Sequence, residues 1–130
     1  MQHRDLTGAI IGICYDVANE LGHGFVESVY QSALAIALAE KGLRVAQQVP
    51  LQVVFRGQPV GQFYADLVVE ESVIIELKAV TALAQEHSAQ LINYLKATGY
   101  DVGLLVNFGH YPKAQVERIV AERGRYAGKA

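Results

Sequence analysis

The sequence predicts an α/β fold in which a mixed sheet of about four strands is flanked by helices. Two segments with helical periodicity open the chain, and three strand-like segments joined by short turns follow them. A further helix then separates the third strand from a fourth, which is the long connection that parallel neighbours require. Strands joined by tight turns pair antiparallel, so the sheet is expected to combine both orientations.

Length and composition bound the classes of protein that this chain can be. With 130 residues it has room for one domain, which we expect to span residues 1–130. Hydrophobic residues make up 52% and charged residues 18%, and this balance excludes a disordered chain. The net charge of -2 argues against a uniformly basic nucleic-acid-coating protein, but it is compatible with a local basic patch.

The chain carries no sign of a membrane or an oxidising compartment. Its single cysteine, Cys14, excludes an intramolecular disulfide and a cysteine zinc site, and its apolar neighbours predict a buried thiol. No apolar stretch approaches the 18 residues of a membrane span, and no signal peptide is recognisable. We therefore expect a soluble cytoplasmic protein without membrane contact.

The N-terminal third is predicted to be helical. Apolar residues recur at three- and four-residue steps over Thr7–Leu21, which predicts a first helix. Gly22 and Gly24 interrupt the pattern. A second helix is expected over Val26–Lys41, and Gly42 is a natural C-terminal stop for it.

The period then changes to two, which is typical of strands. Apolar alternation from Val45 to Phe55 predicts the first strand, and the turn residues 56–59 follow it. A second strand is expected over Gln62–Val69. Polar residues 70–72 connect it to a third strand, Val73–Val80, whose apolar character on both faces predicts a central position.

The last third alternates helix and strand. A helix is expected over Gln85–Thr98 and a fourth strand over Val102–Phe108. Residues 109–112 read as a turn, and a final short helix is expected over Lys113–Glu122. The predicted order is therefore α-α-β-β-β-α-β-α.

Three charged residues interrupt the apolar strands. Asp66 lies in the second strand, and Glu76 and Lys78 lie in the third. A charge in such a strand costs several kcal/mol unless it is paired or bound to a metal. An internal salt bridge to Lys78 is one explanation, but a single lysine compensates only one of the two carboxylates.

Strand periodicity brings these residues together. Glu76 and Lys78 are two residues apart and share a face. If residues 70–72 form the loop, Asp66 lies opposite Glu76, whereas a two-residue loop would turn Asp66 to the other face. Two carboxylates about 4 Å apart repel by roughly 4 kcal/mol at an effective dielectric constant near 20. A cation between them reverses the sign, and hard oxygen ligands suit Mg²⁺ or Mn²⁺.

This pattern resembles the signature of the PD-(D/E)xK nuclease superfamily. Asp66 is followed by Glu76-Leu77-Lys78 on the next strand, although alanine, not proline, precedes Asp66. Gly24, Glu27 and Tyr30 fit the GxxExxY pattern after which one family in that superfamily is named. Further blocks similar to that family lie at 49–50, 90–95 and 104–109, so that the resemblance spans residues 6–120.

The resemblance implies a restriction-endonuclease-like core and a set of site residues. Asp66, Glu76 and the helix-borne Glu27 would be metal ligands, and Lys78 would be the catalytic lysine. Gln90 and Tyr94 match a QxxxY element in a supporting role. Glu27 alone also reads as an acid stabilised by the N-terminus of its helix, and Tyr94 alone also reads as a core aromatic residue.

The function that follows is a nuclease that uses Mg²⁺ or Mn²⁺ to hydrolyse phosphodiester bonds, with DNA favoured over RNA. Two other readings remain open: a non-catalytic module that binds nucleic acid or protein on a nuclease-like fold, and a hydrolase of a small phosphorylated molecule. The apolar edge strand Gln47–Phe55 and the first helix favour a homodimer. The cations that could contact a phosphate are Arg44, Arg56, Lys96, Lys113, Arg118, Arg123 and Arg125.

Overall fold

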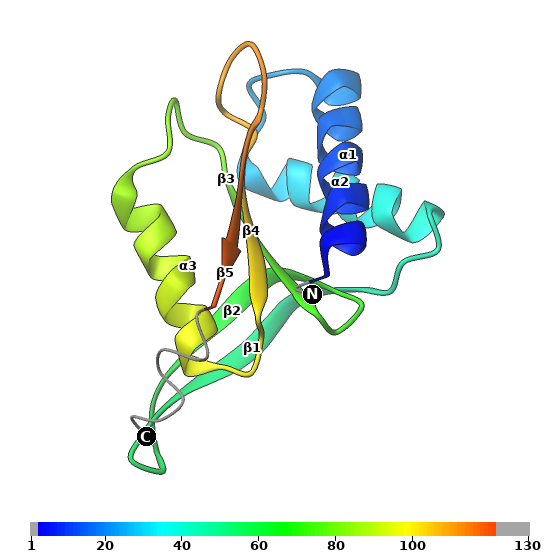
Figure 1. Cartoon of the computed structure of the whole chain (residues 1–130). Helices are drawn as coiled ribbons and strands as arrows, with labels where there is room; N and C mark the ends of the chain where they lie inside the picture. The colour runs from blue at the N-terminus through cyan, green and yellow to red at the C-terminus, as the bar shows by residue number, and fades with distance from the viewer. Residues whose placement is uncertain (1–2, 122–130) are drawn as a thin grey trace.

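A computed structural model of the chain describes residues 3–121 as three helices and five strands (Figure 1). No helix in this part of the chain is long and apolar enough to cross a membrane. The elements, in order, are α1 (Arg4–Leu21), α2 (Glu27–Glu40), β1 (Val45–Phe55), β2 (Gln58–Val69), β3 (Val73–Lys78), α3 (Gln85–Ala97), β4 (Val102–Asn107) and β5 (Gln115–Val120).

The strands form one mixed sheet in the order β1-β2-β3-β4-β5. Only β3 and β4 run parallel, and α3 is the crossover that joins them. The three other neighbouring pairs are antiparallel. The predicted α/β class and mixed sheet are confirmed, but the described sheet has five strands and not about four.

The fifth strand occupies the segment for which a helix was predicted. The prediction of a final helix over Lys113–Glu122 is wrong, because Gln115–Val120 pairs antiparallel with β4. Val116 and Val120 pack on one face of the sheet and Ile119 on the other. Apolar residues on both faces of one strand imitate helical spacing, and β-branched side chains favour the strand. Glu122 itself lies outside the described residues.

Three smaller boundary differences concern the predicted elements. Helix α1 begins at Arg4 rather than Thr7, and β2 begins at Gln58 rather than Gln62. Strand β3 ends at Lys78, two residues before the predicted end at Val80. Lys78 is therefore the last residue of its strand, at the edge where the chain leaves the sheet.

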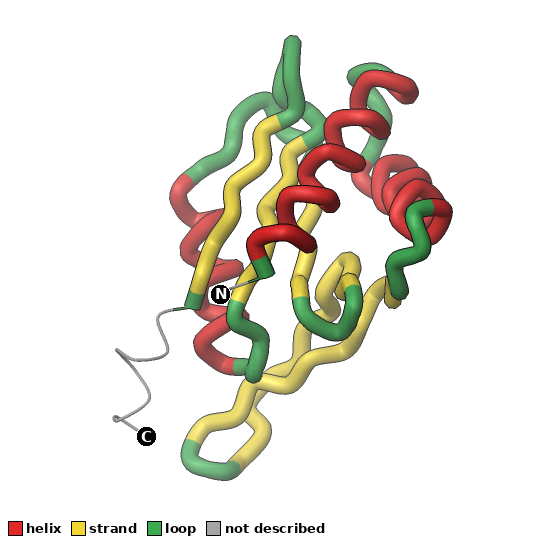
Figure 2. Tube along the Cα trace, turned by 45° about the vertical axis from the view of Figure 1, so that its right-hand side comes forward, coloured by secondary structure: helices red, strands yellow, loops and turns green. Residues whose placement is uncertain are grey.

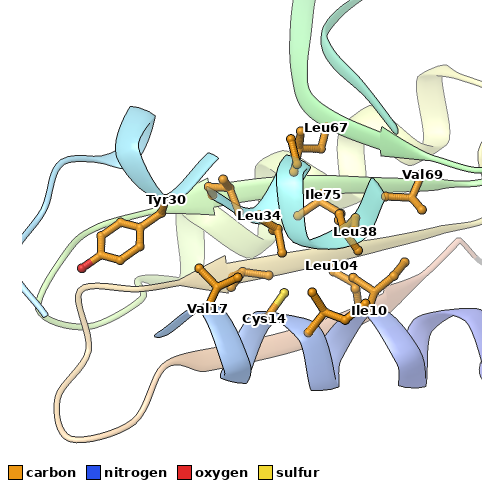
Figure 3. Packing of buried hydrophobic residues seen from close by; sticks show 14 of the residues in the cluster. Ile10, Cys14, Val17, Tyr30, Leu34, Leu38, Leu67, Val69, Ile75 and Leu104 are labelled. Atoms are coloured by element: carbon orange, nitrogen blue, oxygen red, sulfur yellow. The ribbon is translucent and has the colours of Figure 1, made fainter. Parts of the chain in front are cut away.

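Helices α1 and α2 cover one face of the sheet and build the larger core (Figures 1 and 3). Leu34 and Leu38 of α2 lie against strand residues of β2, β3 and β4, and Tyr30 stacks on Phe108, just after β4. Cys14 of α1 is 0% exposed, and burial raises the pKa of its thiol to about 12. The thiol is therefore protonated and inert at neutral pH, as its apolar setting predicts.

Helix α3 alone covers the opposite face. Its Leu91 and Leu95 are buried against Val68, Ile74 and Leu105 of three neighbouring strands. This second core has fewer than half as many buried residues as the first. The α3 face therefore leaves strand ends open to polar side chains.

The side chains of the β1–β2 hairpin, whose backbone is traced in Figure 2, change from one core to the other halfway along its length. Val45 packs with the core under α1 and α2, whereas Val49 and Leu51 pack with the core under α3. Between them lies Gln48, which has a left-handed φ of 49°. Such a residue breaks the alternation of strand side chains. The outer half of the hairpin therefore turns toward α3, and its tip stands clear of the helices.

Candidate active site

Asp66 and Glu76 approach each other where β2 begins to leave β3. The ladder pairs Val69 with Val73 and Leu67 with Ile75, which is the register of the longer loop over residues 70–72. One more step in that register places Asp66 opposite Glu76. The charge of Asp66 acts on the pKa of Glu76, so the two carboxylates are neighbours. Of the two registers that the sequence left open, the structure has the one with the longer loop.

The carboxylate of Asp66 is held by a backbone amide of the neighbouring strand. The described β2–β3 ladder ends at Leu67 and Ile75, and the amide of Leu77 donates to Asp66 Oδ2 at 2.8 Å. A buried backbone amide needs a partner, and here a side chain supplies it. Asp66 is thus fixed at the point where the strands diverge, and its other oxygen, Oδ1, accepts a hydrogen bond from the exposed Gln48 side chain.

Glu76 is the electrostatically strained member of the pair. Burial raises the pKa of its carboxyl to about 8, and the charge of Asp66 adds to the effect while Lys78 opposes it. Its Oε1 is buried and has no hydrogen-bond partner. A buried polar oxygen without a partner is costly, and a hard cation or a proton relieves that cost. The oxygen donors of Asp66 and Glu76 therefore suit Mg²⁺ or Mn²⁺.

Lys78 lies on the same side of the strand as Glu76, two residues further on. The positive charge of its ammonium group interacts electrostatically with Glu76 and lowers the pKa of that carboxyl. Within residues 3–121 no ion pair joins Lys78 to either acid. The site therefore holds a cationic group that influences the carboxylates and remains available to a substrate.

Asn107 fixes the backbone just beyond Lys78. It is opposite Lys78 in the β3–β4 ladder and 0% exposed. Its Oδ1 accepts hydrogen bonds from the amides of Val80 and Gly109, both at 3.0 Å. Its Nδ2 donates to the Val80 carbonyl at 2.9 Å and to Gln115 Oε1 at 3.0 Å. The side-chain amide is fully satisfied and ties three segments together at the end of β3.

Gly109 permits an equally close approach of backbone to backbone. A Cβ atom at this position would lie 2.5 Å from the amide nitrogen and the carbonyl oxygen of Val80. Contacts this short do not occur between side chains and backbone, so any larger residue would displace the segment after β3. The position therefore requires glycine because of space.

Tyr94 brings helix α3 to the acidic pair. Burial raises the pKa of its phenol, and the charges of Glu76 and Asp66 raise it further. Its ring stacks on Phe63 of β2 with centroids 3.5 Å apart. Gln90, one turn earlier, is exposed, and its side chain makes no hydrogen bond within residues 3–121. The structure thus brings Tyr94, but not the Gln90 side chain, to the two carboxylates.

Glu27 is exposed in the first turn of α2. One turn later on the same side of the helix, Gln31 Oε1 accepts a hydrogen bond from Gln48 Nε2 at 2.9 Å. The same Gln48 nitrogen donates to Asp66 Oδ1 at 3.2 Å. This chain of contacts links the helix that carries Glu27 to the acidic pair. However, no three acidic, histidine or cysteine side chains of residues 3–121 are grouped to hold a metal ion.

Sequence reasoning missed the supporting roles of three residues. Asn107 carries a signal, since it is a polar residue within the apolar segment predicted as the fourth strand, and it is the last residue of β4. Gln31 carries a weaker one, since it lies four residues after Glu27. Gln48 carries none, because nothing in the sequence marks its left-handed backbone.

The candidate phosphate-binding cations have different surroundings. Arg44 pairs with Glu70 at 3.3 Å and Glu71 at 3.8 Å, and Arg118 Nε donates to Thr7 Oγ1. The ammonium of Lys113 lies 4.6 Å from the centre of the Tyr15 ring, on the α1 face of the sheet. The remaining pair near the C-terminus, Arg123 and Arg125, lies outside the described residues.

Comparisons with known proteins identify the family. Searches of curated proteins and of solved structures found no match. The model of the PD-(D/E)XK nuclease superfamily matches residues 4–119, and this stretch contains Asp66, Glu76 and Lys78 on adjacent strands. The observed mixed sheet with flanking helices is consistent with a restriction-endonuclease-like fold. The chain belongs to the PD-(D/E)XK nuclease superfamily.

Proposed function

We propose that the protein is a nuclease that requires a divalent metal and hydrolyses phosphodiester bonds, with DNA favoured over RNA. The observation that carries the proposal is the acidic pair at the end of β3, with one orphaned carboxylate oxygen and a neighbouring ammonium group. Family membership supports the reaction class. A purely structural ion pair would instead join Lys78 directly to an acid.

Asp66 and Glu76 would hold the cation, Mg²⁺ or Mn²⁺. Bound there, it would act as a Lewis acid on a phosphoryl oxygen of the substrate. The amide of Leu77 fixes the orientation of Asp66, and such a second contact is what a ligating carboxylate needs. We propose Glu27 as a third acid, because its helix is linked to Asp66 through Gln31 and Gln48.

Lys78 would act directly on the reacting phosphate. Its ammonium group carries positive charge to a phosphate that gains negative charge in the transition state, and it can orient the attacking water. Tyr94 would limit access of bulk water to the acidic pair, with its ring held by Phe63. Gln90, one turn away on the exposed part of α3, would meet the substrate beside that pair.

We also propose that the chain is a member of the GxxExxY family. Two of the three motif positions, Gly24 and Tyr30, have structural roles that support this. Gly24 has a φ of 110°, which side-chain-bearing residues rarely adopt. Tyr30 is buried, stacks on Phe108 with centroids 4.5 Å apart, and donates its hydroxyl to the Gly22 carbonyl at 2.6 Å. These contacts fix the start of α2, from which Glu27 projects.

The test is a cleavage assay on end-labelled DNA with Mg²⁺ or Mn²⁺. We expect the native protein to cut the DNA and Lys78→Ala to be slower by about 10²- to 10⁴-fold, which is the usual contribution of such a group. Lys41→Ala is the matched control, because Lys41 is an exposed lysine at the C-terminus of α2. Full activity of Lys78→Ala at an unchanged melting temperature would remove the catalytic role.

A further inference from the structure

The tip of the β1–β2 hairpin is an exposed ribbon that belongs to neither core. Every residue from 54 to 62, here called the arm, is exposed. Val54, Phe55 and Val60 are 50%, 58% and 60% exposed, which is unusual for large apolar side chains on one short element. Figures 1 and 2 show the arm projecting beyond the helices. Nothing in the described chain covers it, so it is available to a partner.

The charge of the hairpin indicates the kind of partner. The chain holds 13 acidic residues, yet none lies between positions 45 and 65, where the one charged residue is Arg56. The same segment carries five glutamines, at 47, 48, 52, 58 and 62. A surface without carboxylates does not repel a polyanion, and one cation at its tip attracts it. A protein partner held by charge would instead need more than one charged residue here.

The side chains of the arm are suited to nucleic-acid bases. The Arg56 guanidinium lies over the Phe55 ring, 4.9 Å from its centre, and no acid binds it within the described residues. Arginine pairs with guanine and glutamine with adenine through two hydrogen bonds each in the major groove. Gln58 and Gln62 are exposed on the strand that returns toward the site. The arm therefore combines base-reading groups with an apolar tip.

The arm extends away from the candidate site, and its length can be compared with the helical repeat of B-DNA. Strand β2 covers Gln58 to Asp66, with one shift in its pairing register opposite Val53 and Val54, and eight residues at about 3.3 Å each span at most about 26 Å. That is close to three quarters of a turn of B-DNA, which repeats in about 34 Å. A two-stranded ribbon fits the major groove of B-DNA, whereas the major groove of duplex RNA is too narrow.

We propose that the β1–β2 arm lies in the major groove of a DNA duplex whose backbone enters the acidic site. The inference rests on the proposed nuclease function and narrows its substrate to double-stranded DNA. Exposed Tyr64 lies between the arm and Asp66, so the same strand continues from groove to site.

The experiment measures binding of a fluorescent 30-base-pair DNA duplex by anisotropy in EDTA, where cleavage cannot interfere. We expect Arg56→Ala to weaken binding by about fivefold or more. The slope of the logarithm of affinity against the logarithm of salt should fall by about 0.9 if a phosphate contact is lost. Arg56→Lys should restore the slope, and Lys41→Ala, which removes an exposed cation at the end of α2 outside the arm, should leave both quantities unchanged.

Several outcomes would overturn the proposal. These are no duplex binding by the native protein, equal binding by Arg56→Ala, or an equal effect of Arg56→Ala on an RNA duplex or a single strand. Conversion of a native dimer to a monomer by Phe55→Ala, seen by sedimentation, would assign the arm to a second copy of the chain instead.

The two proposals fail separately. If duplex binding depends on Arg56 but no cleavage occurs in Mg²⁺ or Mn²⁺, the proposed nuclease activity is refuted and the proposed DNA-binding role of the arm stands. If the protein cleaves DNA but its affinity for the duplex is the same in Arg56→Ala, the DNA-binding role of the arm is refuted and the nuclease activity stands. Because the arm residues are exposed, their substitution is expected to leave the melting temperature within a few degrees of the native value.

Discussion

The two faces of the sheet differ in how completely they are covered. Under α1 and α2 lies a continuous apolar layer that receives side chains from both helices and from all three central strands. The apolar layer under α3 contains fewer than half as many buried residues. Four polar residues lie at the border of this layer: Asp66, Glu76, Lys78 and Tyr94. One face therefore supplies most of the hydrophobic stabilisation, and the other leaves room for charged groups near solvent.

The comparison also explains how charged residues are tolerated inside strands. β3 alternates between the two faces, so Ile75 and Leu77 enter the larger core while Glu76 and Lys78 point away from it. Glu76 is buried on the α3 face, which has the smaller core, and a cation bound there can compensate the free-energy cost of burying its carboxylate. Alternate residues of β3 thus serve different purposes: those on one face stabilise the fold, and those on the other form the candidate site.

The largest expected effect comes from neighbouring leucines of β4 that face opposite ways. Leu104 lies in the larger core and Leu105 in the smaller one, and both are 0% exposed. We expect Leu104→Ala to lower the free energy of unfolding by about 3–5 kcal/mol and Leu105→Ala by about 2–3 kcal/mol, because the thinner layer relaxes more easily. Urea denaturation measures both.

The same pair tests the separation of the faces. Leu105 is paired with Glu76 in the ladder, so Leu105→Ala should also weaken Mn²⁺ binding, whereas Leu104→Ala should leave it unchanged at temperatures where the protein is folded. Equal losses of stability together with equal effects on Mn²⁺ would show that the two faces are not distinct.

A smaller effect is expected where β3 leaves the sheet. Gly109→Ala introduces a Cβ atom that would overlap the backbone of Val80, and overpacking of this kind costs about 1–3 kcal/mol. Because Asn107 binds both Gly109 and Val80, the displacement should reach Lys78. The cleavage rate should therefore fall even at temperatures where the variant is still fully folded. Gly99→Ala is the control, since its Cβ would meet nothing within 4 Å. Native activity in Gly109→Ala would contradict the positioning role.

The pH dependence of stability isolates Glu76. In the metal-free protein its carboxyl has a pKa of about 8 against an ordinary value of 4.5. Between those values the folded state holds a proton that the unfolded state has lost, so stability falls as pH rises, by up to about 1.4 kcal/mol per unit.

Glu76→Gln should remove that contribution to the slope. Thermal unfolding in EDTA from pH 5 to pH 8 measures it, with the exposed Glu71→Gln as control. The difference between native protein and Glu76→Gln should grow with pH in favour of the variant. A constant difference across the range would show that Glu76 is ionised normally in the fold.

The smallest effect concerns the link from α2 to the site. Gln48→Ala removes the donor to Asp66 Oδ1 and Gln31 Oε1, each worth about 0.5–1.5 kcal/mol at most and less at an exposed position. We expect a loss of under about 1 kcal/mol in stability and a modest weakening of Mn²⁺ binding. A gain in Mn²⁺ affinity would mean that Gln48 competes with the cation for Asp66.

Much of the fold was predictable because its signals are local. Helical spacing in α1 and α2 and alternation in β1 and β2 each depend on neighbours in sequence. The spacing in β5 predicts a helix, because whether a short apolar segment pairs with a neighbouring strand depends on the rest of the sheet and not on local sequence. The left-handed Gln48, which turns the hairpin, leaves no trace in the sequence.

The candidate site was predictable for a different reason. Charges within apolar strands are conspicuous, and strand registry then sets Asp66 beside Glu76 once the loop length is chosen. What could not be predicted is the surrounding support. The amide of Leu77 becomes available only because β2 and β3 diverge, and Asn107 finds its partners in three separate segments.

The most direct measurement is calorimetric titration of Mn²⁺ into the native protein, Asp66→Asn and Glu76→Gln, with Glu71→Gln as an exposed acidic control. Asn at position 66 can still accept the hydrogen bond from Leu77, so the fold is retained while a charge is lost. Binding by the native protein and the control, weakened more than about tenfold in each site variant, is the expected result. No binding by the native protein, or equal binding by all four, would contradict a metal site at Asp66 and Glu76.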